Sequence, residues 1–170
     1  MRGMIMKRIL VLSDSHRGMS FMRWCVETVK PDAIVHLGDF YDDGDELHEE
    51  YRQIPIWQVA GNCDRYCASP AARELLITDV CGVKLFMTHG HRQWVKSGTD
   101  QLIEEATRAG VQAALYGHTH VADCRKEEDL WVLNPGAAGS WGGSCGIIVV
   151  ENGQIVGCRI LRFGDQEELE

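Results

Sequence analysis

Residues 8–16 read Arg8-Ile9-Leu10-Val11-Leu12-Ser13-Asp14-Ser15-His16, an apolar run that ends abruptly in polar side chains. A continuous apolar run of this length is typical of a strand buried on both faces, as in the parallel sheets of α/β proteins. Open sheets of that kind place their ligand sites at the carboxyl ends of the strands, where Asp14 and His16 fall. The stretch therefore predicts an α/β fold with a functional site at one edge of a sheet.

The same arrangement recurs four more times along the chain. Further strands are predicted at 33–37, 56–60, 83–87 and 112–116, and each runs directly into polar side chains. These side chains are, in chain order, Asp39, Asn62 and Asp64, His89 and His91, and His118 and His120. Packing alone does not explain five such strand ends, so we expect the five clusters to converge on one site.

The segments between and after these strands predict the architecture. Apolar residues recur at helical spacing before Pro31, with Ser20 as a candidate N-cap, and again over 99–109. Asn152-Gly153 is a hairpin-turn pair. Three later runs are typical of strands in an antiparallel meander: 130–133, 146–150 and 154–163. We expect an α/β/β/α sandwich, with two sheets packed face to face and helices outside, in a single domain over 1–170.

The acidic segment 42–52 is charged and only weakly periodic, which predicts a loop followed by a short exposed helix. Asp42, Asp43 and Asp45 lack the ligand spacing of a calcium-binding loop and are assigned to the loop surface. His36 lies inside a predicted strand and is expected to be a hydrogen-bonded interior histidine. Cys67 is expected to be packed or partly exposed.

Composition excludes several classes of function. A chain of 170 residues, 45% of them hydrophobic, can bury a substantial core. A formal net charge of -8 disfavours stable nucleic-acid binding, which depends on neutralising phosphates. No run approaches transmembrane length, so we expect no membrane association. Seven scattered cysteines without CxxC pairs favour reduced thiols in a cytoplasmic protein, and residues 165–170 are expected to form a solvated acidic tail. Whether the chain forms a homo-oligomer is left open.

The residue types at the strand ends are metal ligands. Carboxylate, amide and imidazole donors without thiolate suit manganese, iron or zinc, and a carboxylate that bridges two ions holds them roughly 3.5–4 Å apart. The candidate ligands, enough for two ions, are Asp14, His16, Asp39, Asn62, His89, His118 and His120. The alternative is that each is a turn residue or a hydrogen-bonded core residue.

These motifs, in this order, resemble those of the calcineurin-like metallophosphoesterase superfamily. The short length, Gly61-Asn62-Cys63-Asp64 and Asn134-Pro135-Gly136 are similar to its small YfcE/MJ0936-type phosphodiesterases. The resemblance implies two metal sites that share Asp39 as a bridge. The first is formed by Asp14, His16, Asp39 and His120, and the second by Asp39, Asn62, His89 and His118.

The resemblance also implies an activity, the in-line attack of a metal-bridging hydroxide on the phosphorus of a small phosphodiester. The cofactors would be two divalent ions, with Mn²⁺ as the first candidate and Ni²⁺, Zn²⁺ or Fe²⁺ as alternatives. Two rival functions stay open. One is a metal-binding scaffold similar to Vps29, and the other is a phosphomonoesterase or nuclease, of which the small size disfavours a dedicated nuclease.

Three further residues are candidates for catalysis. Many superfamily members have histidine at the position of Cys63, where it contacts substrate or protonates the leaving oxygen, and a thiol does this less well. His91, two residues after His89, is expected either to take over that proton transfer or to complete the metal ligation. Asp64 is expected either to orient a group of the site or to stabilise the turn after Asn62.

Overall fold

The structure is a computed structural model that describes residues 5–65 and 71–165. Within these residues, ten strands form two five-stranded mixed sheets. The first sheet contains β10 (Gln154–Arg162), β9 (Ser144–Glu151), β1 (Met6–Leu12), β2 (Ala33–His36) and β3 (Ile56–Gln58), in that order. The second contains β4 (Leu75–Val80), β5 (Val83–Thr88), β6 (Ala113–Leu115), β8 (Leu130–Asn134) and β7 (Asp123–Glu127).

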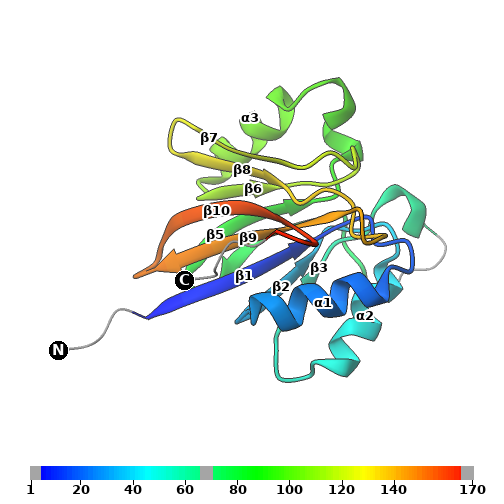
Figure 1. Cartoon of the computed structure of the whole chain (residues 1–170). Coiled ribbons are helices and arrows are strands. Elements are labelled where there is room, and N and C mark those ends of the chain that lie inside the picture. Colours follow the sequence, from blue (N-terminus) through cyan, green and yellow to red (C-terminus); the bar gives the residue numbers. More distant parts are fainter. Residues whose placement is uncertain (1–4, 66–70, 166–170) are drawn as a thin grey trace.

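Helices cover the outer faces of both sheets, which confirms the predicted sandwich (Figure 1). The helices are α1 (Met19–Val29), α2 (Tyr41–Glu50) and α3 (Asp100–Ala109). The first two pack on the first sheet and the third packs on the second. None of the helices in the described ranges is long and apolar enough to cross a membrane.

Strand β1 shows why its sequence is continuously apolar. Ile9 and Val11 pack into the core between the two sheets, whereas Leu10 and Leu12 pack into the core under α1. All four side chains are fully buried. Because successive side chains of a strand point to opposite faces, a strand covered on both faces needs apolar residues at every position.

Strand direction brings the predicted polar clusters to one end of the molecule. In the first sheet β1, β2 and β3 are parallel, and in the second β5, β6 and β8 are parallel. Hydrogen bonds then join the strand ends, from Asp14 N to Gly38 O at 2.9 Å and from Gly117 N to His89 O at 2.9 Å. The five strand ends therefore meet along a common edge.

The last third of the chain differs from the predicted meander. Strand β8 joins the second sheet, parallel to β6 and in an antiparallel hairpin with β7, whereas β9 and β10 form an antiparallel hairpin on the first sheet. Its turn has positive φ at both Asn152 and Gly153, as a type I′ turn requires. Strand β7 was not predicted, because its sequence Asp123-Cys124-Arg125-Lys126-Glu127 has the charges of an exposed edge strand and little apolar pattern.

Two local predictions are wrong. Helix α1 begins at Met19, with Gly18 in the N-cap position, so Ser20 is a helical residue and not the cap. Asp43 is not on a loop surface: helix α2 begins at Tyr41, directly after the strand end, and Asp43 lies on its buried face. Cys67 and the tail residues 166–170 lie outside the described residues.

Candidate metal centre

Five of the predicted ligands, His118 with a φ of 71° among them, have a backbone conformation that is uncommon for residues other than glycine. Asp14, His16, Asp39 and His120 have φ values of 53°, 40°, 58° and 62°, all in the left-handed region. Such conformations persist only where the surrounding structure imposes them, and they concentrate at functional sites. Here they turn each chain sharply at the end of its strand, so that the side chains point toward a common centre.

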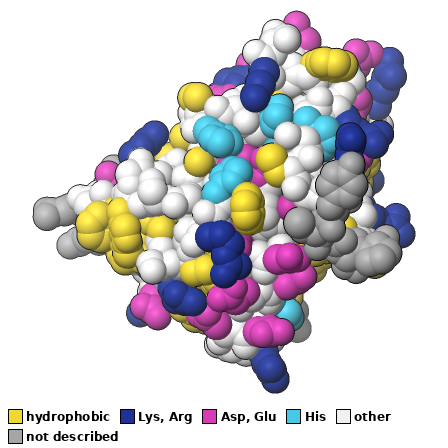
Figure 2. All heavy atoms as spheres, turned by 90° about the vertical axis from the view of Figure 1, so that its right-hand side faces the viewer, with side chains coloured by type: hydrophobic (Ala, Val, Ile, Leu, Met, Phe, Trp, Pro, Cys, Tyr) yellow, Lys and Arg dark blue, Asp and Glu magenta, His cyan; other side chains and the backbone are white. Residues whose placement is uncertain are grey.

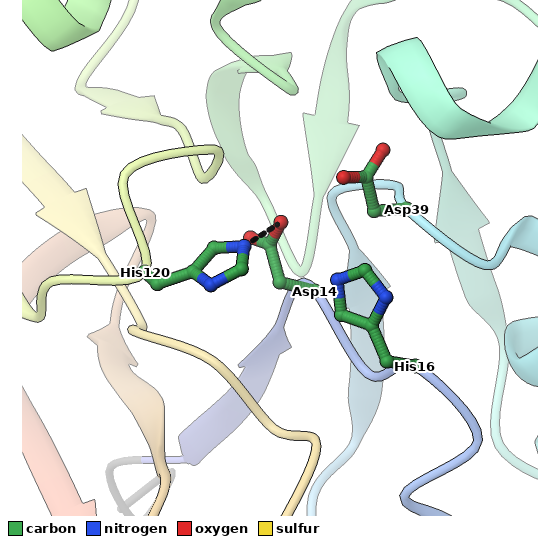
Figure 3. Close-up of side chains that lie close together, drawn as sticks. All are labelled: Asp14, His16, Asp39 and His120. Carbon is green, nitrogen blue, oxygen red and sulfur yellow. Dashed lines mark ion pairs between the residues drawn. The ribbon is translucent and has the colours of Figure 1, made fainter.

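Four of these side chains form a compact donor set (Figure 3). One ligand atom from each of Asp14, His16, Asp39 and His120 lies within 4.8 Å of all the others. The two carboxylates are buried, whereas the two imidazoles are exposed. Figure 2, which views the end of the molecule that lies on the right in Figure 1, shows histidine side chains gathered on this face. The set is therefore anchored in the protein and open to solvent on one side.

Asp14 provides the test of whether a cation fits here. Its Oδ2 accepts hydrogen bonds from Ser13 Oγ at 2.6 Å and from His118 N at 3.1 Å. Its Oδ1 is buried and accepts no hydrogen bond, although His120 Nε2 lies 3.1 Å away. Leaving a buried carboxylate oxygen without a partner costs roughly 1–3 kcal/mol or more, and a bound cation would remove that cost. The donors present thus fit a divalent metal ion.

Three of the residues predicted for the second ion also lie together. His89 Nε2 is 3.5 Å from Asp39 Oδ2, and His118 Nδ1 is 3.2 Å from His89 Nε2. The other ring nitrogen of His89 lies 2.8 Å from Leu37 O, a contact that orients the ring as metal-binding histidines usually are. Asn62 is exposed, with its Nδ2 3.7 Å from Cys63 Sγ, and no hydrogen bond within 5–65 and 71–165 joins its side chain to Asp39 or His89.

The charges around His89 favour a cation between the carboxylates. Burial lowers the pKa of His89, but Asp39 and Asp14 beside it outweigh burial, so the pKa is raised. Burial likewise raises the pKa of Asp39, yet His89 and the Cys63 amide hold that pKa well below its usual range. The electrostatic field of the two carboxylates is thus strong enough to favour positive charge at this position.

The Asp64 carboxylate holds the Asp39 segment in place. It is almost fully buried and accepts hydrogen bonds from four backbone amides, those of Asp39, Phe40 and Tyr41 at 2.8 Å and that of Gly61 at 2.7 Å. Two of these amides, those of the N-cap residue Phe40 and of Tyr41, lie at the start of α2, where the N–H groups have no partner within the helix. These contacts agree with both roles predicted for Asp64, since the Asp39 amide belongs to a ligand and the Gly61 amide belongs to the turn around Asn62.

Two glycines allow backbone to approach the buried carboxylates. A Cβ at Gly61 would overlap Asp39 Oδ1, and a Cβ at Gly117 would overlap Ser13 Oγ and lie 2.8 Å from Asp14 Oδ2. Glycine is required at both positions because no side chain fits between the converging strand ends.

Cys63 contacts the donor set through Asp39, whereas His91 lies beside His89. The Cys63 amide donates to Asp39 Oδ1 at 3.0 Å, and burial and then Asp39 raise the pKa of its exposed thiol to about 11. The His91 ring centroid lies 5.6 Å from that of His89, and His91 Nε2 lies 3.5 Å from Glu74. The structure thus places Cys63 beside the Asp39 carboxylate and His91 beside His89.

One buried hydrogen-bond network at the site was not predicted from the sequence. Asp43 Oδ2 accepts hydrogen bonds from Ser15 Oγ at 2.8 Å and from Arg17 N at 2.7 Å. Ser15 Oγ also lies 2.9 Å from His36 Nε2, so His36 is the hydrogen-bonded interior histidine that was predicted. Helix α2 therefore fixes the loop that carries Asp14 and His16. The only sequence signal was an acidic residue four positions after Asp39, which is not distinctive.

A fold of two packed mixed sheets with histidines and carboxylates at the strand ends defines a class of metal-binding phosphoesterases, and sequence comparison agrees. The chain belongs to the calcineurin-like phosphoesterase superfamily, whose domain profile matches residues 6–153. Phosphodiesterase MJ0936 of Methanocaldococcus jannaschii is 28% identical over 144 residues, which cover 76% of this chain and 82% of that protein.

Two solved structures extend the comparison. An uncharacterised protein from Streptococcus pneumoniae, described as a predicted phosphoesterase, matches with a TM-score of 0.74 and 26% identity over 94% of this chain and 91% of that chain. Vacuolar protein sorting 29 from Cryptosporidium parvum matches with a TM-score of 0.71 and 17% identity, over 94% of this chain and 99% of that one. The second likeness concerns the fold alone.

The assignment of His118 and His120 to different ions has a direct test. His120 belongs to the compact donor set, whereas His118 contacts His89. We expect His120→Ala and His118→Ala each to lower the tightly bound metal from about two equivalents to about one, because each removes a ligand from one ion only. Metal analysis after gel filtration measures this. If either variant loses both ions while its fold is intact, the two histidines do not serve separate sites.

Proposed function

We propose that the chain is a metal-dependent phosphodiesterase with a centre for two divalent ions, and that Mn²⁺ is the first candidate. The observation that carries the proposal is the compact donor set of Asp14, His16, Asp39 and His120, in which a buried carboxylate oxygen of Asp14 accepts no hydrogen bond. The name of the phosphodiesterase relative supports diester substrates. A cytoplasmic location belongs to the same proposal, supported by the free thiols of the described cysteines.

The residues of the site would have different roles in hydrolysis. Asp14 and Asp39 supply negative charge from the buried side, and His16 and His120 complete the set on the solvent side, where a phosphodiester can enter. Bound divalent ions would activate water near neutral pH and neutralise the charge of the phosphoryl oxygens. The hydrogen bonds of Asp64 and Asp43 hold the ligand loops in place, which limits reorganisation when the ions and the substrate bind.

The proposal is tested by stripping the metal, reloading with Mn²⁺, Ni²⁺, Zn²⁺, Fe²⁺ or Mg²⁺, and assaying bis(4-nitrophenyl) phosphate and 4-nitrophenyl phosphate. We expect hydrolysis that depends on metal, with a higher kcat/KM for the diester. Stoichiometric metal binding without turnover for any metal would favour the rival scaffold function, for which the Vps29-like fold is the supporting observation. Preference for the monoester would favour a phosphomonoesterase.

Cys63 leads to a prediction about the leaving group. Because a thiol is a poorer proton donor than imidazolium, log kcat should depend steeply on leaving-group pKa across a series of aryl methyl phosphates. Cys63→His should flatten that dependence and raise turnover of the least acidic leaving group by about tenfold. Cys124→His on the β7 edge strand serves as the matched control and should leave the slope unchanged. A flat dependence in the wild type would mean that another group, such as His91, already protonates the leaving oxygen.

A further inference from the structure

A cavity of about 550 Å³ opens directly beside the donor set, a size typical of small-molecule sites. Asp14, His16 and His120 line it, together with Ser140 and Arg162. The remaining lining residues are uncharged: Val121, Ala122, Ala137, Gly139, Gly142, Gly143 and Ser144. Apart from the metal ligands, Arg162 is thus the charged residue of this cavity.

The topology of the first sheet explains why Arg162 reaches the site. Strand β9 is antiparallel to both β1 and β10, so β10 runs parallel to β1 and its end, Arg162, falls at the same edge as Asp14. Two strand spacings separate β10 from β1, which is about 10 Å. Along β10, Ile160 packs between the sheets and Leu161 packs on the outer face, so alternation directs Arg162 to the side of the second sheet, which carries His120.

Arg162 is exposed and available to a ligand. Its backbone N–H donates to Asp165 Oδ2 at 2.7 Å, but no ion pair among the described residues involves its guanidinium group. The chain has a formal net charge of -8, so most of its surface repels anions. A cation that lines a cavity next to a metal centre is therefore positioned to attract an anionic part of the substrate.

The geometry points to Arg162 as a specificity-determining residue that binds a second anionic group of the substrate. The preferred substrates are then phosphodiesters that carry a further phosphate about one sugar away from the scissile phosphate. This inference rests on the proposed phosphodiesterase function. Arginine suits this task because its planar fork binds phosphate through two parallel hydrogen bonds. The backbone of β10 lies about 10 Å from β1, so the Arg162 side chain can contact a second phosphate carried on the sugar next to a scissile phosphate at the ions.

A nucleoside carries the two phosphates in the probe compounds, because its sugar separates a 5′-phosphate from a 3′-phosphate. Phe163 and Trp141, which directly follow Arg162 and Ser140, pack edge to face on each other and on Trp24 of α1. They therefore lie on the outer face of the first sheet, opposite to the side to which alternation directs Arg162, and the inference rests on Arg162 and the cavity alone.

The kinetic test compares thymidine 5′-(4-nitrophenyl phosphate) with the same ester carrying a 3′-phosphate, using the manganese-loaded protein. We expect the wild type to have about tenfold higher kcat/KM for the 3′-phosphorylated ester, mainly through KM. Arg162→Met should bring this ratio close to one, and Arg162→Lys, which keeps the charge but not the fork, should give an intermediate ratio. Arg108→Met, at an exposed position on α3, is the matched control and should keep the wild-type ratio. A wild-type ratio near one, or an unchanged ratio in Arg162→Met, would overturn the inference.

A binding measurement separates this inference from the proposed function. Calorimetric titration of the manganese-loaded protein with thymidine 3′,5′-bisphosphate and thymidine 5′-monophosphate should show about tenfold tighter binding of the bisphosphate, lost in Arg162→Met. If this difference in Kd is present but neither ester is hydrolysed, the phosphodiesterase function is rejected and the role of Arg162 stands. If both esters are hydrolysed and the two Kd values are equal, only the role of Arg162 is rejected.

Discussion

Replacing Asp39 with asparagine should reduce kcat/KM for bis(4-nitrophenyl) phosphate by about a thousandfold, because a single change removes negative charge from both predicted metal positions. Asp39 belongs to the compact donor set with Asp14, and its Oδ2 faces His89 at 3.5 Å in the second group. The amide keeps the size of the side chain, so the loss is electrostatic. Steady-state kinetics in excess Mn²⁺, together with metal analysis of the desalted protein, measure the effect.

The matched control is Asp129→Asn, which makes the same chemical change at an exposed residue between β7 and β8. It should stay within about twofold of the wild type in kcat/KM and bind the same amount of metal. If Asp39→Asn keeps wild-type activity and both metal equivalents, the bridging assignment of Asp39 is wrong.

Replacing Asp64 with alanine should destabilise the fold by about 3 kcal/mol or more and abolish tight metal binding. The substitution leaves four backbone amides without the carboxylate that accepts their hydrogen bonds, and two of them lie at the N-cap and first residue of α2. It also frees the Asp39 backbone, so the ligand loses its position. Urea unfolding followed by tryptophan fluorescence gives the change in the free energy of unfolding.

Asp45→Ala serves as the control for this substitution. Asp45 is an exposed residue of α2, and its side chain accepts one hydrogen bond from the side chain of Gln58. Its effect on the free energy of unfolding should be about 0.5 kcal/mol or less. A change below about 1 kcal/mol for Asp64→Ala would show that the amides find other partners and that Asp64 does not hold the loop.

The parts of this protein that follow from sequence are those with a strong local pattern. The apolar run before Asp14 can be stable only as a strand covered on both faces, and the same reasoning holds for the strands before Asp39 and His118. Because parallel strands end at one edge, the meeting of these residues also follows from the pattern. The hairpin at Asn152-Gly153 was predictable for a similar reason, since both residues tolerate positive φ.

Other parts depend on contacts that no local pattern encodes. The buried position of Asp43 comes from hydrogen bonds with Ser15 and Arg17, residues 28 and 26 positions earlier in the chain. The residues around Asp43 in the sequence are mostly acidic, which is typical of a solvent-exposed segment. Strand β8 pairs with β6 in the second sheet, but its apolar sequence would fit either sheet, so the sequence does not determine which sheet it joins. The role of Arg162 needs the path of β9 and β10 back to the first sheet, which places that residue at the edge where the ligands lie.

Two ions at this site are proposed to drive phosphodiester hydrolysis, and titration of metal-stripped protein with Mn²⁺ while hydrolysis of bis(4-nitrophenyl) phosphate is followed tests this. The proposed function predicts a rate that rises with added metal and reaches its plateau at about two equivalents per chain. A plateau at one equivalent would contradict the two-ion centre, and the absence of hydrolysis at saturating metal would contradict the phosphodiesterase function.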